Sequence, residues 1–115
     1  MLTDFSNIGI SVLVVTMDDD DRAKKAFDEW HIPDLPFAHG LPEHQARAWG
    51  LFISKRVKQS EPDIFSEPGA FLIKPDGTLY SQFQSAAPWL RLDLSVLYRG
   101  IQLAMKRGTP PRGGE

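Results

Sequence analysis

The sequence predicts an α/β domain in the order β-α-(short β)-α-β-β-α, with a C-terminal β-hairpin and a covering helix. Three observations carry this prediction. Ile10–Met17 is apolar almost throughout, which is typical of a strand covered on both faces. Lys74–Gly77 has turn chemistry between two β-prone runs, and residues 91–107 carry one apolar helical stripe. The 115 residues fit one domain, which we place at 1–107, with 108–115 expected as a disordered tail.

The first predicted elements surround the apolar strand Ile10–Met17. Before it, Leu2 and Phe5 fit the last turn of a helix, which Asn7 and Gly9 would end. This placement makes Ile10–Met17 the first strand of the domain.

A charged helix is predicted after this strand, over residues 22–30. Asp18–Asp21 would cap its N-terminus and match the positive end of the helix dipole. The segment 31–33, with its proline, would end the helix. Its apolar stripe has the spacing of an amphipathic helix and consists of Ala23, Ala26, Phe27 and Trp30.

The middle of the chain predicts a very short strand, a second helix and a loop. Leu35–His39 can hold the strand. Pro42 suits the first helical position and Gly50 the C-terminal end of the helix. Ser54–Ser66 is polar, contains a proline and is expected to be irregular. The apolar face of this second helix would comprise Leu41, Ala46, Trp49 and Phe52.

The C-terminal part gives the clearest local pattern. Ala70–Ile73 and Thr78–Phe83 flank a Lys-Pro-Asp-Gly turn, which predicts a β-hairpin. A last helix should run from about Arg91 to Arg107, with Gly108 as its cap. Its stripe consists of Leu90, Leu94, Leu97, Ile101 and Ala104.

Composition excludes several classes of function. The net charge is -2, whereas nucleic-acid binding usually shows a basic excess. The chain has no cysteine, which removes disulfides, thiolate nucleophiles and zinc–thiolate or iron–sulfur ligation. The N-terminus has no basic segment followed by an apolar run, and no stretch reaches membrane-spanning length. We therefore expect a globular protein of the cytoplasm that binds neither nucleic acid nor membrane.

No motif in the chain predicts a metal, cofactor or catalytic site. His31, His39 and His44, with Glu43, match no usual zinc spacing, and surface histidines are the expected interpretation. Asp18–Asp21 lacks the glycine and final glutamate of an EF-hand loop. Gly-x-Ser-x-Gly, Gly-x-Gly-x-x-Gly and Gly-Lys-Ser/Thr motifs are absent from the sequence.

Three sequence runs together resemble a known family. They are the Glu67–Tyr80 segment around Pro-Asp-Gly, the Val12–Thr16 strand before an acidic helix start, and Ala48–Phe52. In this order they look like the second half of a thioredoxin fold, and more narrowly like the peroxiredoxin-like alkyl hydroperoxide reductase and thiol-specific antioxidant family. The resemblance covers about residues 2–107 and implies a partial thioredoxin-like fold.

Two departures from the family pattern bear on function. The family's first strand and its cysteine-bearing helix would lie before Leu2, so no residue here matches the nucleophile. The arginine of peroxiredoxins is also missing, because the equivalent positions read Pro68-Gly69-Ala70. What the resemblance does carry over is Pro68, which matches the family's cis-proline and, with Gly69, would shape a groove. A proline that merely starts an edge strand is the alternative.

The missing strand has a physical consequence for assembly. A sheet without its central strand leaves backbone groups unpaired, at about 1–3 kcal/mol for each buried group. Either Ile10–Met17 pairs directly with the hairpin, or another chain supplies the partner. We expect a homodimer, formed by strand pairing or segment exchange. Trp30, Trp49 and Trp89 are expected as packing residues, and Trp89 is the one expected to contact a partner.

The leading functional hypothesis is a non-catalytic relative of this family that acts through binding or oligomerisation. A second hypothesis makes the chain the C-terminal part of a longer thiol-dependent oxidoreductase, whose cysteine lies upstream of Met1. That enzyme would reduce peroxides or disulfides. A third is a protein with no selected function beyond folding.

Overall fold

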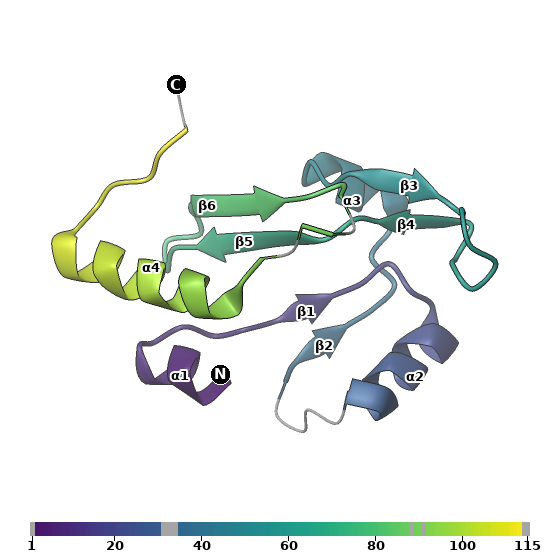
Figure 1. Ribbon diagram of the computed structural model, residues 1–115, viewed down its shortest axis with the longest axis horizontal. Helices are drawn as coiled ribbons and strands as arrows, with labels where there is room; N and C mark the ends of the chain where they lie inside the picture. Colours follow the sequence, from purple (N-terminus) through teal and green to yellow (C-terminus); the bar gives the residue numbers. More distant parts are fainter. Residues whose placement is uncertain (1, 31–34, 88, 91, 114–115) are drawn as a thin grey trace.

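The computed structural model describes residues 2–30, 35–87, 89–90 and 92–113, and it shows a mixed α/β chain (Figure 1). The described part contains four helices and three two-stranded sheets. In chain order the elements are α1 (Leu2–Asn7), β1 (Val14–Val15), α2 (Asp20–Trp30), β2 (Phe37–Ala38), α3 (Glu43–Ala48), β3 (Ile53–Lys55), β4 (Ile64–Ser66), β5 (Gly69–Ile73), β6 (Leu79–Gln84) and α4 (Leu94–Arg107).

The first half contains a β-α-β crossover. β1 and β2 pair in parallel and α2 connects them, as the sequence predicts. The side chain of Asp19 accepts a hydrogen bond from the backbone N–H of Arg22 and so caps α2. Phe27 of α2 meets Phe37 of β2 edge to face, with ring centroids 6.4 Å apart. The predicted end of this helix at 31–33 lies outside the described residues, and the structure does not describe the side chain of Trp30, for which packing is predicted.

The strand predicted over Ile10–Met17 is much shorter in the structure. Only Val14 and Val15 belong to a ladder, because the partner strand β2 is itself only two residues long. Leu13, which the sequence places in the interior, is 61% exposed. The expected burial on both faces is therefore wrong, since none of the side chains from Ile10 to Met17 is buried.

The polar segment 54–66, expected to be irregular, forms a second hairpin. β3 and β4 pair antiparallel, with Ser54 opposite Phe65. The turn between them is tied by the carboxylate of Glu61, which accepts hydrogen bonds from the N–H groups of Val57 and Lys58. Side-chain chemistry in the turn thus compensates for strands that are too short and too polar to show a period-two pattern.

The predicted hairpin at the C-terminal side is confirmed. β5 and β6 pair antiparallel around the Lys74–Gly77 turn, with a register shift between Leu72 and Ile73. The N–H of Gly77 donates to the carbonyl oxygen of Lys74 at 2.9 Å, and Gly77 has a φ of 88°. Only glycine adopts that angle without strain, which is why the Pro-Asp-Gly sequence identifies the turn.

The last helix begins at Leu94, three residues later than the sequence predicts. Asp93 supplies the reason, because its carboxylate accepts hydrogen bonds from the N–H groups of Ser95 and Val96. Gly108 ends the helix in a left-handed conformation, as predicted. The buried face includes Ile101, and Tyr98 meets Phe5 of α1 edge to face at 5.6 Å. α1 and α4 therefore pack together.

The chain is open for its size. Its accessible surface is 8938 Å², whereas a compact protein of its mass exposes about 6,300 Å². Within the described part, the buried apolar side chains are Phe5, Ala23, Ala46 and Ile101. No ladder in that part joins the three strand pairs, so the direct pairing of β1 with the hairpin does not form.

Candidate functional site

Pro68 and Gly69, the residues that the family resemblance singles out, lie where β4 passes into β5. The Glu67–Pro68 peptide bond is trans. Pro68 is exposed, and its carbonyl oxygen accepts a hydrogen bond from the N–H of Ser85 at 3.4 Å. In the structure Pro68 therefore starts a strand, which is the alternative interpretation.

Gly69 allows a close approach between β5 and the segment after α3. A Cβ atom added to Gly69 would lie 2.5 Å from Cδ2 of Leu51, closer than such atoms normally come. Trp49, just before this segment, meets Phe71 of β5 with ring centroids 6.3 Å apart. The small residue at 69 thus lets the end of α3 pack against the sheet.

Trp89 lies in the connection between β6 and α4 and is 81% exposed. Ser85 begins this connection with a tight turn, in which its hydroxyl accepts from the N–H of Ala87 and donates to the carbonyl oxygen of Ala87. Because Ser85 also contacts Pro68, the connection starts at the same end of the hairpin as the Pro68–Gly69 pair. The structure gives Trp89 the exposure that a partner contact needs.

Each strand of the three two-stranded sheets has one edge without a ladder partner among the described residues, and β5 is an example. On β5, the hydrogen bonds between Pro68 and Ser85 and between Lys74 and Thr78 fix which residues point toward β6. By alternation, the N–H and C=O groups of Gly69, Phe71 and Ile73 point away from β6. No hydrogen bond to these groups occurs in the described part of the chain.

β1 has the same property. The N–H groups of Val14 and Thr16 donate to the carbonyl oxygens of Pro36 and Ala38, so they point toward β2. The groups of Leu13 and Val15 therefore point away from β2, and they too have no partner among the described residues. We call these two rows of free groups the β1 edge and the β5 edge.

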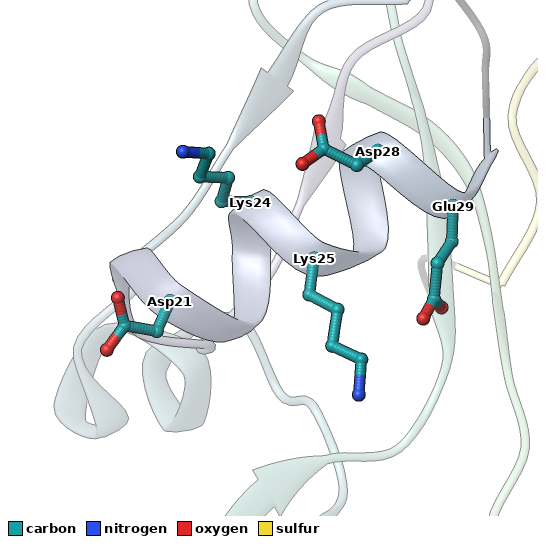
Figure 2. A pocket seen from close by; sticks show the side chains of 5 residues that line it. All are labelled: Asp21, Lys24, Lys25, Asp28 and Glu29. Carbon is teal, nitrogen blue, oxygen red and sulfur yellow. The ribbon is translucent and has the colours of Figure 1, made fainter.

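A surface hollow of about 420 Å³ lies along α2. Figure 2 shows that its lining side chains project from the surface of this single helix. Lys25 and Glu29 extend on one side of it, and Lys24 and Asp28 on the other (Figure 2). Such opposite charges four residues apart stabilise an exposed helix, so this face needs no ligand to explain it.

A smaller hollow, of about 230 Å³, lies at the C-terminal end of β1. Its wall brings Thr16–Asp18 beside Phe65 and Ser66 of β4 and the turn residues Glu61 and Pro62. Two of its polar side chains already have partners, since Thr16 Oγ1 accepts a hydrogen bond from the N–H of Asp18 and the Glu61 carboxylate accepts from the β3–β4 turn. The C-terminal end of β1 therefore lies beside the β3–β4 hairpin.

Ionisable groups do not gather into a reactive cluster in the described residues. No group of three or more metal-ligating side chains occurs there. His39 Nδ1 lies 3.1 Å from Asp20 Oδ1 at the surface, and His31 lies outside the described residues. The pKa of Asp76 is lowered, mainly because the hydroxyl of Thr78 donates a hydrogen bond to its carboxylate. The Asp76 carboxylate thus binds Thr78 within the turn of the β5–β6 hairpin.

None of the described helices is long and apolar enough to cross a bilayer.

The free strand edges are the feature that the sequence indicated only indirectly. An apolar run at Ile10–Met17 signals a strand that needs two neighbours, but not which edge lacks one. That depends on pairings between residues far apart in the chain, such as Val14 with Phe37. Comparisons with protein-family models, with curated proteins and with solved structures found no match.

Proposed function

We propose that this chain is a non-catalytic, cysteine-free relative of thioredoxin-like and peroxiredoxin-like proteins, which acts by binding other polypeptides and forms a homodimer. The absence of cysteine supports the non-catalytic part, because electron transfer of that kind requires a thiolate. The described residues also contain no group of three or more side chains that could hold a metal ion.

The observation that carries the proposal is the unusually large exposed surface. It exceeds that of a compact chain of this mass by about 2,600 Å². A stable interface between two proteins buries about 800 Å² on each partner. The chain therefore exposes enough additional surface for a dimer contact and for a second partner. The most exposed large apolar side chains are Val57, Trp89, Leu13, Leu90 and Ile73.

The outer face of α4 supports self-association. Val96 and Leu103 are 55% and 47% exposed and lie on the side opposite the buried Ile101. Between them lies Gly100, where a Cβ atom added to the backbone would meet no other atom within 4 Å. Two antiparallel α4 helices, related by a two-fold axis near Gly100, bring Val96 of each copy against Leu103 of the other. The glycine allows the two helices to approach closely.

Sedimentation velocity tests the homodimer directly. At micromolar concentration we expect a mass twice the chain mass of 12.9 kDa. Leu103→Lys should give a monomer, because it replaces one of the two apolar side chains of the proposed contact with a charge. Gln102→Lys, at the neighbouring position, adds the same charge and is the matched control that should remain dimeric. A monomeric wild-type protein at about 100 µM, a concentration at which even weak dimers form, contradicts the homodimer.

The second candidate function is that of a longer thiol-dependent oxidoreductase, of which this chain is the C-terminal part. The free edges of β1 and β5 favour it, because a strand supplied by the rest of a longer chain could pair with such an edge. An in-frame strand–Cys–helix sequence in the coding DNA directly upstream of Met1 would support this candidate. Peroxide reduction by that longer protein, lost on Cys→Ser substitution, would establish it, whereas a non-coding upstream region excludes it.

A further inference from the structure

We propose that the outer face of α4 binds an acidic amphipathic helix of a partner polypeptide in preference to a second copy of this chain. This inference rests on the proposed binding function, and it names the surface and the chemistry of the partner. The outer face is the side of α4 opposite the buried Ile101. It comprises Val96, Arg99, Gly100, Leu103, Lys106 and Arg107.

The first argument is an apolar row on this face that suits a second helix. Val96 and Leu103 are two helical turns apart, so they lie on the same side of α4, separated by about 10.5 Å along its axis. Each is about half-exposed. Gly100 lies between them and leaves space, because a Cβ atom added there would meet no other atom within 4 Å. Apolar side chains at this spacing form the contact row between paired helices.

The second argument is that cations border this row on both sides. The helical rotation of about 100° per residue places Arg99 and Lys106 on one side of the row and Arg107 on the other. All three residues are exposed. Their side chains make no ion pair or hydrogen bond within the part of the chain that the structure describes. Charges beside the apolar row determine which helices pair, so this face favours a partner with carboxylates at the matching positions.

The third argument is the concentration of positive charge in this part of an acidic chain. Residues 94–113 contain four basic residues and no acidic one, which leaves nine of the 13 basic residues and all 15 acidic residues for the rest of the chain. On α2 acidic side chains accompany the lysines, whereas α4 has no acidic side chain to compensate its cations. The resulting positive potential around α4 attracts acidic partners and repels basic ones.

A second copy of the chain matches this face less well than an acidic helix does. In the antiparallel contact of two α4 helices, the two-fold axis near Gly100 brings Arg99 of one copy beside Arg99 of the other. Like charges at such a contact oppose association. An acidic helix packs on Val96 and Leu103 in the same way but attracts the cations that border them. A bilayer suits the face less, because helices that lie in a membrane surface bury a broader apolar side than this single row.

A synthetic helix tests the inference. The acidic peptide consists of three repeats of Glu-Leu-Glu-Ala-Leu-Glu-Ala, which places glutamate on both sides of a leucine row, and the control peptide has glutamine in place of every glutamate. Fluorescence anisotropy of the labelled peptides should show that the acidic peptide binds at least about 10-fold more tightly than the control. In sedimentation velocity, saturation with the acidic peptide should give a complex of one chain with one peptide.

Three results would overturn the inference. The first is equal affinity for the acidic and control peptides, or binding of neither. The second is a protein that remains dimeric when it is saturated with the acidic peptide. The third is co-sedimentation with vesicles of phosphatidylcholine containing about 30% phosphatidylglycerol by a chain that does not bind the acidic peptide, which would assign the face to an anionic membrane surface.

Variants of Arg99 separate this inference from the homodimer. Arg99→Gln should weaken binding of the acidic peptide about 3-fold, and it should tighten the homodimer because it removes the repulsion between the two copies. Arg99→Lys keeps the charge and should bind the peptide nearly as well as wild type. Lys24→Gln, which removes one positive charge from α2, is the matched control and should change neither association.

The two associations can fail independently. If Arg99→Gln weakens both the peptide complex and the homodimer, Arg99 supports the helix itself rather than contact with an acidic partner, and the inference fails. A monomeric wild-type protein that binds the acidic peptide would contradict the homodimer and support the inference.

Discussion

Pro68 and Gly69 show that the same two residues can be interpreted as lining a groove or as beginning a strand. We predicted from their sequence that they shape a groove, yet the Glu67–Pro68 bond is trans and Gly69 packs against Leu51. A local sequence cannot distinguish these two uses, because the contact with Leu51 comes from a segment 18 positions earlier. At the scale of the residue, the interaction free energy between positions 69 and 51 can be measured.

The Gly69–Leu51 contact predicts a specific coupling. Gly69→Val should destabilise the fold by about 1–3 kcal/mol, because the added side chain overlaps Leu51. In a Leu51→Ala background the same substitution should cost less, with an interaction free energy of about 1 kcal/mol. Urea unfolding of the four proteins in this cycle measures it. Strictly additive free energies of unfolding would contradict the close packing.

Asp76 predicts a pH effect of known sign. Its pKa in the folded chain is lowered from 3.8, mainly by the hydroxyl of Thr78 and then by the backbone N–H of Thr78. A lowered folded pKa means that the charged carboxylate stabilises the fold above 3.8, and that this contribution is lost as the pH falls through the folded pKa. When the pH is lowered from about 6 to about 2, the free energy of unfolding should therefore fall less for Asp76→Asn than for wild type.

The measurement for Asp76 is urea unfolding at both pH values, supported by NMR titration of the carboxyl carbon. Thr78→Val keeps the branched shape of the side chain but removes the hydroxyl donor, so it should move the pKa of Asp76 up toward its ordinary value. An unchanged titration in this variant would show that the hydroxyl is not the main cause.

At the scale of the element, local chemistry accounts for the turns and helix ends. Lys74–Gly77 is recognisable because proline and glycine at fixed turn positions favour one backbone path. The sequence does not predict the β3–β4 hairpin, because each of its strands has three residues, too few to show alternation. Its turn depends on Glu61, a residue type with no strong turn preference. The sequence places the start of α4 too early because the apolar stripe extends past Asp93, which caps the helix.

The cap of α4 predicts a stability change. Asp93→Ala should lower the free energy of unfolding by about 1 kcal/mol, because the N–H groups of Ser95 and Val96 lose their acceptor. Asp93→Asn retains an acceptor and should cost much less. Chemical denaturation measures both changes, and an equal loss in the two variants would show that charge, rather than the cap geometry, matters.

At the scale of the whole molecule, the chain combines good local structure with little shared core. Its radius of gyration is 15.4 Å, against about 13.4 Å for a compact domain of this length. An aromatic pair joins α1 to α4, namely Phe5 with Tyr98, and another joins α2 to β2, namely Phe27 with Phe37. A partner that covers the exposed apolar surface would therefore add a large part of the total stability.

This dependence predicts a concentration-dependent thermal transition. If folded chains associate and unfolded chains do not, raising the protein concentration about 100-fold should raise the Tm by about 5 °C. Differential scanning calorimetry at about 1 µM and at about 100 µM measures this change in Tm. The Leu103→Lys variant should show a Tm that does not change with concentration. A wild-type Tm independent of concentration would contradict self-association.

The sequence by itself determined the α/β class, the parallel crossover, the β5–β6 hairpin, the C-terminal cap at Gly108 and the lack of thiol chemistry. These follow from residue type and short-range periodicity, which act within a few positions of the chain. The tertiary structure decided that β1 has only two paired residues, that Gly69 packs under Leu51, and that the β1 and β5 edges remain free. Such features depend on which distant segments meet, and pairing over long separations is set by the collective packing of the chain rather than by any local preference.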